Sequence, residues 1–538
     1  MCVLYHNKPI LIMNRFNYAL TRILKLCLLI AITVLPSFIA GNRNDLNPLL
    51  QYSISMNEPG NHLFHVILNC KRLKEDTIDF RMPQWMPGYY QIMNYSKEVR
   101  NFSATSMKDM SLPFINTGNN TWRVIPGKNA SFRISYDVYS DKKFVASNYL
   151  DTTHAYIVPA ATFMYINEHT DIPVSLKVIP YKAWKDIATG LEKSNGNINM
   201  FFAPDFDILY DCPILIGNLE ELPSFEINGI IHRFVAYNPG SFDRDLFISG
   251  LEKTVRAGID IIGDIPYKEY TFIGIGPGNG GIEHLNNTTV SFNGNGLDKP
   301  GAIIRMLKFL GHEYFHHYNV KRIRPYELGP FDYDRENRTN LLWMSEGVSV
   351  YYEYLMVKRA GLMSEDELLK SIDGNINTVE NDAGRHYQSL SRCSYETWED
   401  GPFGNKPGGA DKSISYYEKG PVIGMILDFS IRNATENKKS LDDVMRFLYW
   451  QYYKKLNRGF SDAEFQMVCE EIAGIPLSRE FEYVYTTREI DYSTYLSYAG
   501  LKISEEIDKN TGKRKFTLSR QETINPLQLS IFQSWSGN

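Results

Sequence analysis

The chain has 538 residues, of which 57 are Lys or Arg and 62 are Asp or Glu, so its formal net charge is −5. This near-neutral balance argues against a nucleic-acid-binding protein, because such proteins usually carry a surplus of basic side chains. Charged residues make up 22% and hydrophobic residues 43%, a balance that excludes a wholly disordered chain. The length exceeds what one core usually serves, so we expect about two or three domains.

Residues 1–40 differ in composition from the rest of the chain. Basic residues precede an apolar run from Leu26 to Ala40, which Pro36 interrupts. A basic flank before about fifteen apolar residues resembles a secretory signal, whereas a membrane span needs about 20. We therefore expect export to the periplasm or the cell exterior, with an uncleaved N-terminal anchor as the alternative and Met13 as an alternative start. No later segment looks long and apolar enough to insert stably into a membrane.

Cysteines are sparse after this N-terminal segment, and no C-x-x-C motif is present. A disulfide scaffold would need more cysteines than this for about 500 residues. Export permits a disulfide, but the sequence does not pair the cysteines, and we expect free buried thiols. The four cysteines concerned are Cys70, Cys212, Cys393 and Cys469.

Residues 41–215 show short stretches of alternating apolar and polar side chains, separated by turn sequences such as EPGN, TGNN and PGKN. This pattern is typical of β-strands and predicts an all-β, sandwich-like N-terminal domain. We interpret residues 82–90 (MPQWMPGYY) as a structural loop. The strands are expected in HLFHVILNC, DTIDFRM, NTWRVIPG, ASFRISYDVYS and VSLKVI.

Residues 216–490 change to a mostly helical pattern with a few strands, which indicates an α+β domain. Apolar residues spaced three or four apart predict a helix over about residues 243–264, between the strand-like IIHRFVAYN and EYTFIGIG. A glycine-rich turn (GPGNGG) and one strand-like stretch (IEHLNNTTVSF) follow, and then mainly helices. Residues 491–538 are expected to form a short β-like C-terminal tail, with strands around the turn DKNTGK.

The strongest chemical signal is His312-Glu313-Tyr314-Phe315-His316. Residues four apart lie on one face of a helix, so His312 and His316 can bind one metal ion, and zinc is the usual ion for such a pair. Glu313 is placed to accept a proton from the attacking water. The apolar helical pattern of residues 302–310 runs into the motif and predicts a buried site. His317 points to another side of the helix, and we interpret it as structural.

A zinc site in an enzyme usually has three protein ligands and one open position. Glu346, in WMSEG at the start of another helical stretch, is the expected third ligand, and one zinc ion is expected per chain. Glu353 lies two helical turns further on the same face. There its carboxylate can hydrogen-bond a liganding histidine, as metal sites commonly require.

At this point the sequence resembles the glycyl aminopeptidase family of zinc metallopeptidases, related to aminopeptidase N. The likeness lies in HEYFHHYNVKRIRP, GPFDYDRENRTNLLWMSEGVSVYYEYL and SYYEKGPVIGMILDFSIR, and also in GNGGIEH, MPQWMPGYY and SNYLDTTHAY. It covers about residues 48–500. The resemblance implies a thermolysin-like fold for residues 216–490 and a preference for peptides with small N-terminal residues such as Gly or Ala.

The resemblance also implies roles for individual residues. His312, His316 and Glu346 match the zinc ligands, and Glu313 matches the general base. Tyr417 matches the tyrosine that stabilises the oxyanion, although Tyr416 is adjacent. Gly281 and Glu283, in GNGGIEH, lie where the related family binds the substrate and holds its free amine. The match is looser there, because histidine follows Glu283 where aminopeptidase N has asparagine.

Members of the resembled family commonly carry a C-terminal PDZ domain of roughly 80–90 residues. We expect that domain to be absent or truncated here, because the resemblance ends at about residue 500. Two other functions stay open at the sequence level, namely an endopeptidase with the same zinc chemistry and a non-catalytic binding protein that keeps the fold. The sequence does not indicate an oligomeric state.

Overall fold

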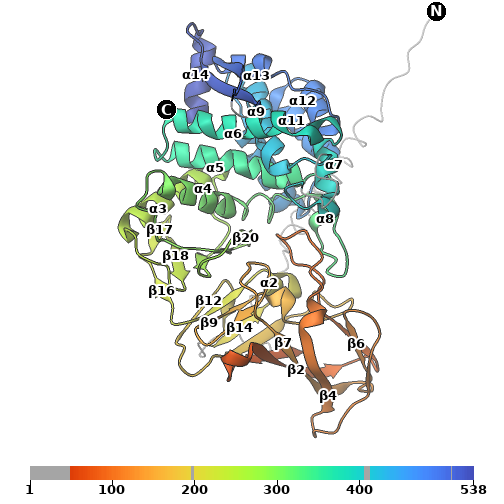
Figure 1. Cartoon of the computed structure of the whole chain (residues 1–538). Helices are drawn as coiled ribbons and strands as arrows, with labels where there is room; N and C mark the ends of the chain where they lie inside the picture. Colours follow the sequence, from red (N-terminus) through yellow and green to blue (C-terminus); the bar gives the residue numbers. More distant parts are fainter. Residues whose placement is uncertain (1–48, 195–198, 405–411, 510–511, 538) are drawn as a thin grey trace, which may run out of the picture. The chain divides into compact units, whose positions relative to one another are not determined.

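The computed structural model of this chain describes residues 49–194, 199–404, 412–509 and 512–537 (Figure 1). The expected export signal lies outside these residues. Residues 48–538 form one compact unit. Within the described residues, no helix has the length and hydrophobicity that a membrane crossing needs. The four cysteines in this part of the chain are buried and unpaired, as expected.

The N-terminal part of the described chain is built from β-sheets, as the sequence predicts. Its largest sheet in the described residues has the strand order β13-β14-β11-β1-β2-β7-β4. The strands of this sheet are β1 (Leu50–Ser55), β2 (Leu63–Leu73), β4 (Val99–Ser106), β7 (Ala130–Tyr139), β11 (Val174–Ile179), β13 (Glu192–Lys193) and β14 (Met200–Ala203).

Two smaller sheets complete this β domain, with strand orders β10-β3-β6-β5 and β12-β15-β9-β8 in the described residues. Side chains of the first and the largest sheet share one core, where the rings of Phe80 and Phe132 lie 6.1 Å apart. Alternate residues of β2 and β7 are buried, because successive side chains of a strand point to opposite faces. The added elements are β3 (Ile78–Arg81), β5 (Phe114–Asn116), β6 (Thr121–Val124), β8 (Tyr149–Leu150), β9 (His154–Ile157), β10 (Tyr165–Ile166), β12 (Asp186–Thr189), α2 (Phe206–Tyr210) and β15 (Ile214–Gly217).

A mixed sheet begins the second part of the chain, with the described strands in the order β16-β18-β19-β21-β20 and β17 beside β18. Strands β18 and β19 are parallel, and parallel neighbours need a crossover, which α3 supplies. Its bounds confirm the predicted helix, with Asp243 as the N-cap. The elements are β16 (Glu220–Glu221), β17 (Phe225–Ile227), β18 (Ile230–Ala236), α3 (Arg244–Ile262), β19 (Glu269–Gly274), β20 (Gly281–Glu283) and β21 (Asn287–Val290).

The stretch IEHLNNTTVSF differs from the single strand that its composition suggests. It folds back on itself, so that β20 and β21 pair in antiparallel fashion with Gly281 opposite Val290. The reversal falls at residues 284–286, where the Asp211 carboxylate accepts the backbone N–H of Leu285 at 2.7 Å. Strand β20 therefore forms an edge of the sheet. Its last residue, Glu283, can face another element there.

Helices form most of the remaining chain, and their apolar side chains make up one large core with the mixed sheet. Helix α4 packs between α3 and α5, and α9 packs against α5 and α6. These helices are α4 (Ala302–Phe315), α5 (Val348–Arg359), α6 (Glu365–Asn381), α7 (Leu390–Tyr395), α8 (Thr397–Asp400), α9 (Tyr416–Ala434), α10 (Leu441–Phe447), α11 (Asp462–Ala473) and α12 (Ser478–Tyr485).

The C-terminal tail contains the predicted hairpin, with β22 (Leu501–Ile507) paired to β23 (Arg514–Arg520). Two helices flank it that the sequence analysis did not predict, α13 (Tyr492–Tyr498) and α14 (Pro526–Ser536). Helix α14 is held against the helical core, because the Trp535 indole N–H donates to the Tyr351 hydroxyl at 2.8 Å. The tail is thus part of the same compact unit.

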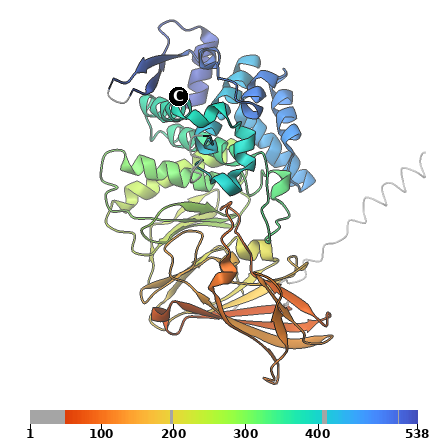
Figure 2. The same ribbon diagram turned by 45° about the vertical axis from the view of Figure 1, so that its right-hand side comes forward.

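A loop of the β domain, residues 82–90, reaches up toward α8 (Figures 1 and 2). The loop is held in this position by the segment that lies between His316 and Glu346 in the sequence. Gln84 donates its side-chain N–H to the carbonyl of Asp334, and the Trp85 indole donates to the carbonyl of Asp332, both at 2.8 Å. The Asp334 carboxylate also pairs with Arg81 at 2.8 Å. These bonds fix the loop against the second part of the chain.

Candidate active site

Helix α4 ends at the histidine pair. His312 and His316 are both buried and lie one turn apart, with their Nε2 atoms 2.9 Å from each other. Because side chains four residues apart share a face of a helix, the two rings converge on one point. The chain leaves the helix directly after His316, so the pair occupies the C-terminal end of α4.

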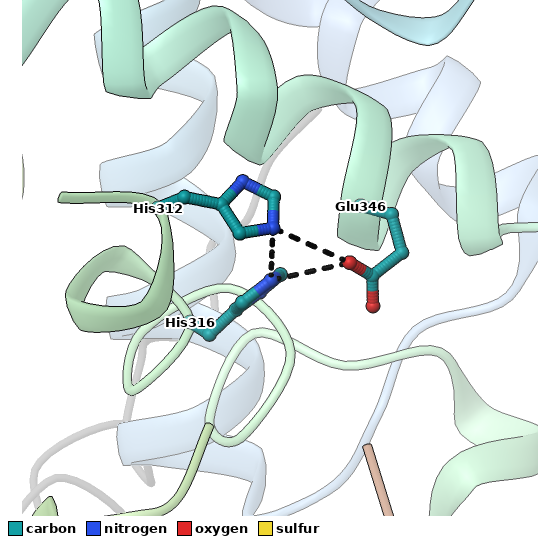
Figure 3. Close-up of side chains that lie close together, drawn as sticks. All are labelled: His312, His316 and Glu346. Atoms are coloured by element: carbon teal, nitrogen blue, oxygen red, sulfur yellow. Dashed lines mark hydrogen bonds and ion pairs between the residues drawn. The ribbon is translucent and has the colours of Figure 1, made fainter. Parts of the chain in front are cut away.

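Glu346 completes a cluster of three with these histidines (Figure 3). One oxygen of its carboxylate, Oε2, lies 3.2 Å from His316 Nε2 and 3.7 Å from His312 Nε2. Glu346 belongs to a π-helical turn, Trp343–Gly347, which leads into α5. Such wide turns are rare and occur frequently at functional sites. The structure therefore brings together the three residues that the sequence analysis expects to bind the metal.

The other ring nitrogen of each histidine also has a partner. His316 Nδ1 lies 2.7 Å from the backbone carbonyl of Asn319, and His312 Nδ1 lies 3.3 Å from a Glu353 carboxylate oxygen. An acceptor at Nδ1 favours the tautomer that leaves the Nε2 lone pair free for a metal. Glu353 lies where the sequence analysis expects it, whereas Asn319 was not identified. Its amide also donates to the Met344 carbonyl at 3.0 Å and so ties the turn of Glu346 to α4.

The geometry fits a tetrahedral zinc ion. Ligand atoms about 2.0–2.2 Å from such an ion lie roughly 3.3–3.6 Å from one another, close to the three separations found here. Two imidazoles and one carboxylate are also a donor set that zinc accepts in enzymes, with a fourth position left for water or substrate. The site is buried among other carboxylates, and a divalent cation would compensate their charge.

Electrostatics at the cluster favour the charged form of each group. Burial alone would raise the pKa of Glu346, but the neighbouring His316 and His312 outweigh it and hold that pKa well below the usual range. Burial alone would lower the pKa of His312, but the neighbouring Glu346 and Glu353 carboxylates outweigh it and raise that pKa. The carboxylates therefore create strong negative potential around the ring nitrogens, and a metal cation experiences the same attraction.

Glu313 lies beside the cluster and faces strand β20. Burial raises the pKa of its carboxyl to about 8, with part of that rise offset by His312 and His316. Its Oε2 has no hydrogen-bond partner among the described residues. A Cβ on Gly281 would lie 2.3 Å from Glu313 Oε1, so a side chain at this position would force the Glu313 carboxylate to shift. Gly281 thus lies next to the expected general base.

Glu283 lies two residues further along β20 and is 4% exposed. Its Oε1 is buried and has no hydrogen-bond partner among the described residues. A buried carboxylate oxygen without a partner is costly, and a cationic ligand beside it would lower that cost. Glu283 is close enough to His316, Glu313 and Tyr417 to shift their pKa values. The carboxylate therefore belongs to the same site as the histidines.

Tyr417 and Tyr416 begin helix α9 and differ in what they contact. The Tyr416 hydroxyl is buried and shares a hydrogen bond of 3.1 Å with the Thr397 hydroxyl. The Tyr417 ring lies 6.1 Å from the His312 ring, and its phenol is close enough to Glu346 for that carboxylate to act on it electrostatically. Burial and then the Glu346 charge raise the pKa of Tyr417 well above its usual value, so its hydroxyl keeps its proton. Of the two, Tyr417 is the phenol that faces the cluster.

Close packing brings α9 to this position. A Cβ added to Gly347 would lie 2.5 Å from the Cα of Gly420, and a Cβ on Gly420 would lie 2.6 Å from the Cα of Gly347. The two backbones therefore cross without side chains between them. This contact fixes the start of α9, with Tyr417, next to the turn that carries Glu346.

The loop 82–90 of the β domain also borders the site. Tyr90 is buried against Trp398 of α8, and Glu346 and Glu283 both contribute to the high pKa of Tyr90, after burial. A Cβ on Gly88 would lie 2.9 Å from Glu283 Oε2. The loop is therefore more than a structural connection, which corrects its interpretation from the sequence. Two aromatic turns flanked by prolines were the signal that could have identified it.

Comparison with known proteins gives two matches to one peptidase family. The model of the M61 peptidase N-terminal domain matches residues 51–218, and the model of the M61 glycyl aminopeptidase matches residues 305–423. Together these matches cover more than half of the chain. No curated protein sequence matches this chain.

Solved structures share the fold. An aminopeptidase N family protein from Idiomarina loihiensis is 27% identical, with a TM-score of 0.80 over 86% of this chain and 80% of that chain. Two more distant structures show the fold alone. An M1 zinc metallopeptidase from Deinococcus radiodurans is 12% identical, with a TM-score of 0.51 over 82% of this chain and 93% of that chain. Leukotriene A4 hydrolase from Saccharomyces cerevisiae is 13% identical, with a TM-score of 0.50 over 84% and 70%.

The first prediction concerns the metal. His316→Ala should lose most of the zinc that the parent binds at about one ion per chain, because it removes one of three protein ligands. Metal analysis after dialysis measures this loss. His154→Ala, which removes a buried histidine of the β domain, serves as the control and should keep the zinc. Equal zinc contents in His316→Ala and the parent would disprove the ligand assignment.

Proposed function

This chain belongs to the M61 glycyl aminopeptidase family and is a zinc-dependent aminopeptidase, and from that premise we propose that it removes small N-terminal residues, Gly and Ala first, from peptides. We further propose that Glu313 is the general base, that Tyr417 stabilises the oxyanion and that Glu283 binds the free amine. The apolar stretch of residues 26–40 supports the proposal that the protein is exported.

The proposed reaction begins with water attacking the first peptide bond of the substrate. A zinc ion held by His312, His316 and Glu346 would polarise the scissile carbonyl and lower the pKa of the attacking water. Glu313 takes a proton from that water and passes it to the leaving amine. Its buried Oε2, which has no hydrogen-bond partner among the described residues, supports this role, because a base needs a free oxygen to take the proton.

Tyr417 is proposed to donate its hydroxyl hydrogen bond to the oxygen on which negative charge develops. A fixed donor in a site shielded from water stabilises the transition state more than a donor in bulk water. The tyrosine's position beside His312 and Glu346 supports this role, as does the high pKa of its phenol. Tyr416 is less suited, because its hydroxyl is already bonded to Thr397.

The observation that carries the proposed function is the buried carboxylate of Glu283, whose Oε1 has no hydrogen-bond partner among the described residues. A substrate α-ammonium that enters a buried cleft must be paired, because its desolvation otherwise opposes binding. A fixed carboxylate at this point would also set the register, so that only the first peptide bond reaches Glu313. The endopeptidase alternative needs no such group, and a non-catalytic binding protein needs neither Glu283 nor Glu313.

Glu313→Gln tests the base. The amide is nearly isosteric but cannot accept the proton, so turnover of Ala-arylamide should fall by roughly 10²–10⁴-fold. Zinc content should stay at the parent level, which metal analysis checks in the same preparation. Activity within a few-fold of the parent, with zinc bound, would place the base elsewhere.

Tyr417→Phe tests the oxyanion donor. It should lower kcat by roughly 10²–10³-fold, the usual cost of losing one donor, while KM changes little. Tyr416→Phe is the matched control, because it removes the neighbouring hydroxyl. Steady-state kinetics on both variants compares them directly. A large loss in Tyr416→Phe and a small one in Tyr417→Phe would reverse the assignment.

The function itself is tested with free and blocked amines. The parent should cleave Gly- and Ala-arylamides and should not cleave the N-acetylated forms. Glu283→Ala should keep its zinc, raise KM and lower kcat/KM for the free amines by roughly 10²-fold, the effect of losing a charge-assisted pair. If the parent cleaves acetylated peptides as fast as free ones, the aminopeptidase proposal fails and the endopeptidase alternative replaces it.

A further inference from the structure

The turn that follows strand β20 is held by a buried carboxylate of the β domain. Asp211, the C-cap residue of helix α2, accepts the backbone N–H of Leu285 at 2.7 Å through its Oδ2 atom. Leu285 lies two residues beyond Glu283. We propose that Asp211 is a positioning residue, which fixes this backbone and so aims the Glu283 carboxylate at the substrate's amine. The inference rests on the proposed function for the role of Glu283.

Glu283 depends on its backbone for its position. Strand β20 spans only Gly281–Glu283 and, among the described strands, pairs with β21 alone, where Glu283 lies opposite Thr288. The Oε1 atom of the Glu283 side chain has no hydrogen-bond partner among the described residues. A short edge strand does not by itself fix the residue at its end, because it is hydrogen-bonded on one side only. The turn that follows therefore decides where this carboxylate lies.

Both backbone groups of Leu285 are bound by charged side chains. Asp211 accepts from its N–H, and the Nη1 atom of Arg322 donates to its carbonyl at 2.9 Å. The same Nη1 donates to the carbonyl of His317, directly after the histidine pair, at 2.6 Å. Arg322 is buried, so these bonds lie in a low-dielectric environment, where they are stronger than in water. The turn is thus tied to the β domain on one side and to the histidine motif on the other.

A buried ion pair holds Asp211 itself in place. Its Oδ1 atom lies 2.5 Å from the Lys321 ammonium nitrogen and 3.3 Å from His284 Nδ1. Burial alone would raise the pKa of Asp211, but Lys321 and His284 outweigh it and hold that pKa below its usual value. The backbone N–H of Lys321 donates to the His316 carbonyl at 3.1 Å, so the pair also refers back to the metal cluster. A buried ion pair adds little net stability over an apolar pair and requires accurate geometry, which suits a positioning role.

Steady-state kinetics tests the role first. Asp211→Ala should raise KM for Gly-arylamide by at least about tenfold and leave kcat within a few-fold of the parent, because a misplaced carboxylate weakens binding of the amine while the metal cluster stays intact. Asp205→Ala removes the N-cap of the same helix α2 and is the matched control, which should keep the KM of the parent. In a Glu283→Ala background, adding Asp211→Ala should change KM no further, because the group through which Asp211 acts is gone.

Calorimetry on the zinc-loaded protein separates positioning from a general loss of structure. Glycine hydroxamate carries a free amine and acetohydroxamate does not, whereas both offer the same zinc-binding group. The parent should bind glycine hydroxamate more tightly. Asp211→Ala should reduce that preference by at least about tenfold and leave the affinity for acetohydroxamate unchanged. An equal loss of affinity for both compounds would show a merely structural role and would overturn the inference.

A second variant keeps the test decisive where Asp211→Ala does not fold. Asp211→Leu combined with Lys321→Met replaces the buried ion pair by apolar side chains of similar volume, a change that is often neutral for stability. It also removes the acceptor of the Leu285 N–H, so the preference for the amine should fall as in Asp211→Ala. If the parent prefers the amine and either folded variant keeps that preference, the positioning role is overturned and the proposed function stands. If the parent binds both hydroxamates equally and cleaves acetylated substrates, the proposed function fails and the inference fails with it.

Discussion

The arrangement of the site follows from the cost of burying negative charge. Three carboxylates are buried in the site, and each of Glu283, Glu313 and Glu346 is 5% exposed or less. The charges of Glu283 and Glu346 both raise the pKa of Glu313. A buried carboxylate costs several kcal/mol unless it is paired. The two imidazoles lie against Glu346, whereas Glu283 and Glu313 each keep a buried oxygen without a hydrogen-bond partner among the described residues, so the cluster needs further positive charge. A zinc ion and the substrate's ammonium group would supply it. Without such cations, this concentration of buried carboxylates would lower the stability of the fold.

Close backbone packing makes this concentration of charge possible. The turn of Glu346 contacts helix α9 through Gly347 and Gly420, and it contacts α4 through the amide of Asn319. Helix α5, which continues from this turn, is supported from the other side. There the Trp535 indole donates to the Tyr351 hydroxyl, which in turn donates to Asp428 at 2.7 Å. The histidines, Glu346 and Tyr417 thus lie on elements whose relative positions leave little freedom.

The β domain takes part in the site rather than preceding it as a separate module. Its loop of residues 82–90 is bonded to the segment that links the histidine motif to Glu346, and it contacts Glu283. These bonds give a structural reason for the length of the segment between the histidine motif and Glu346. It carries Asp332 and Asp334, which bind the loop, in addition to connecting two parts of the metal cluster. A change in this loop can therefore alter the surroundings of Glu283 without touching the histidine pair.

The sequence by itself determined what depends on local periodicity. The spacing of His312 and His316 fixes both rings on one helical face, and alternating or helical patterns predicted the β domain, helix α3 and the hairpin β22–β23. Tertiary structure decided what depends on contacts distant in the chain. Those contacts are the hydrogen bond between His316 and the Asn319 carbonyl, the packing of Gly347 against Gly420, the pairing of β20 with β21, and the approach of Gly88 to Glu283. None of these has a repeating pattern, because each results from two surfaces packing together, and packing is a property of the whole fold.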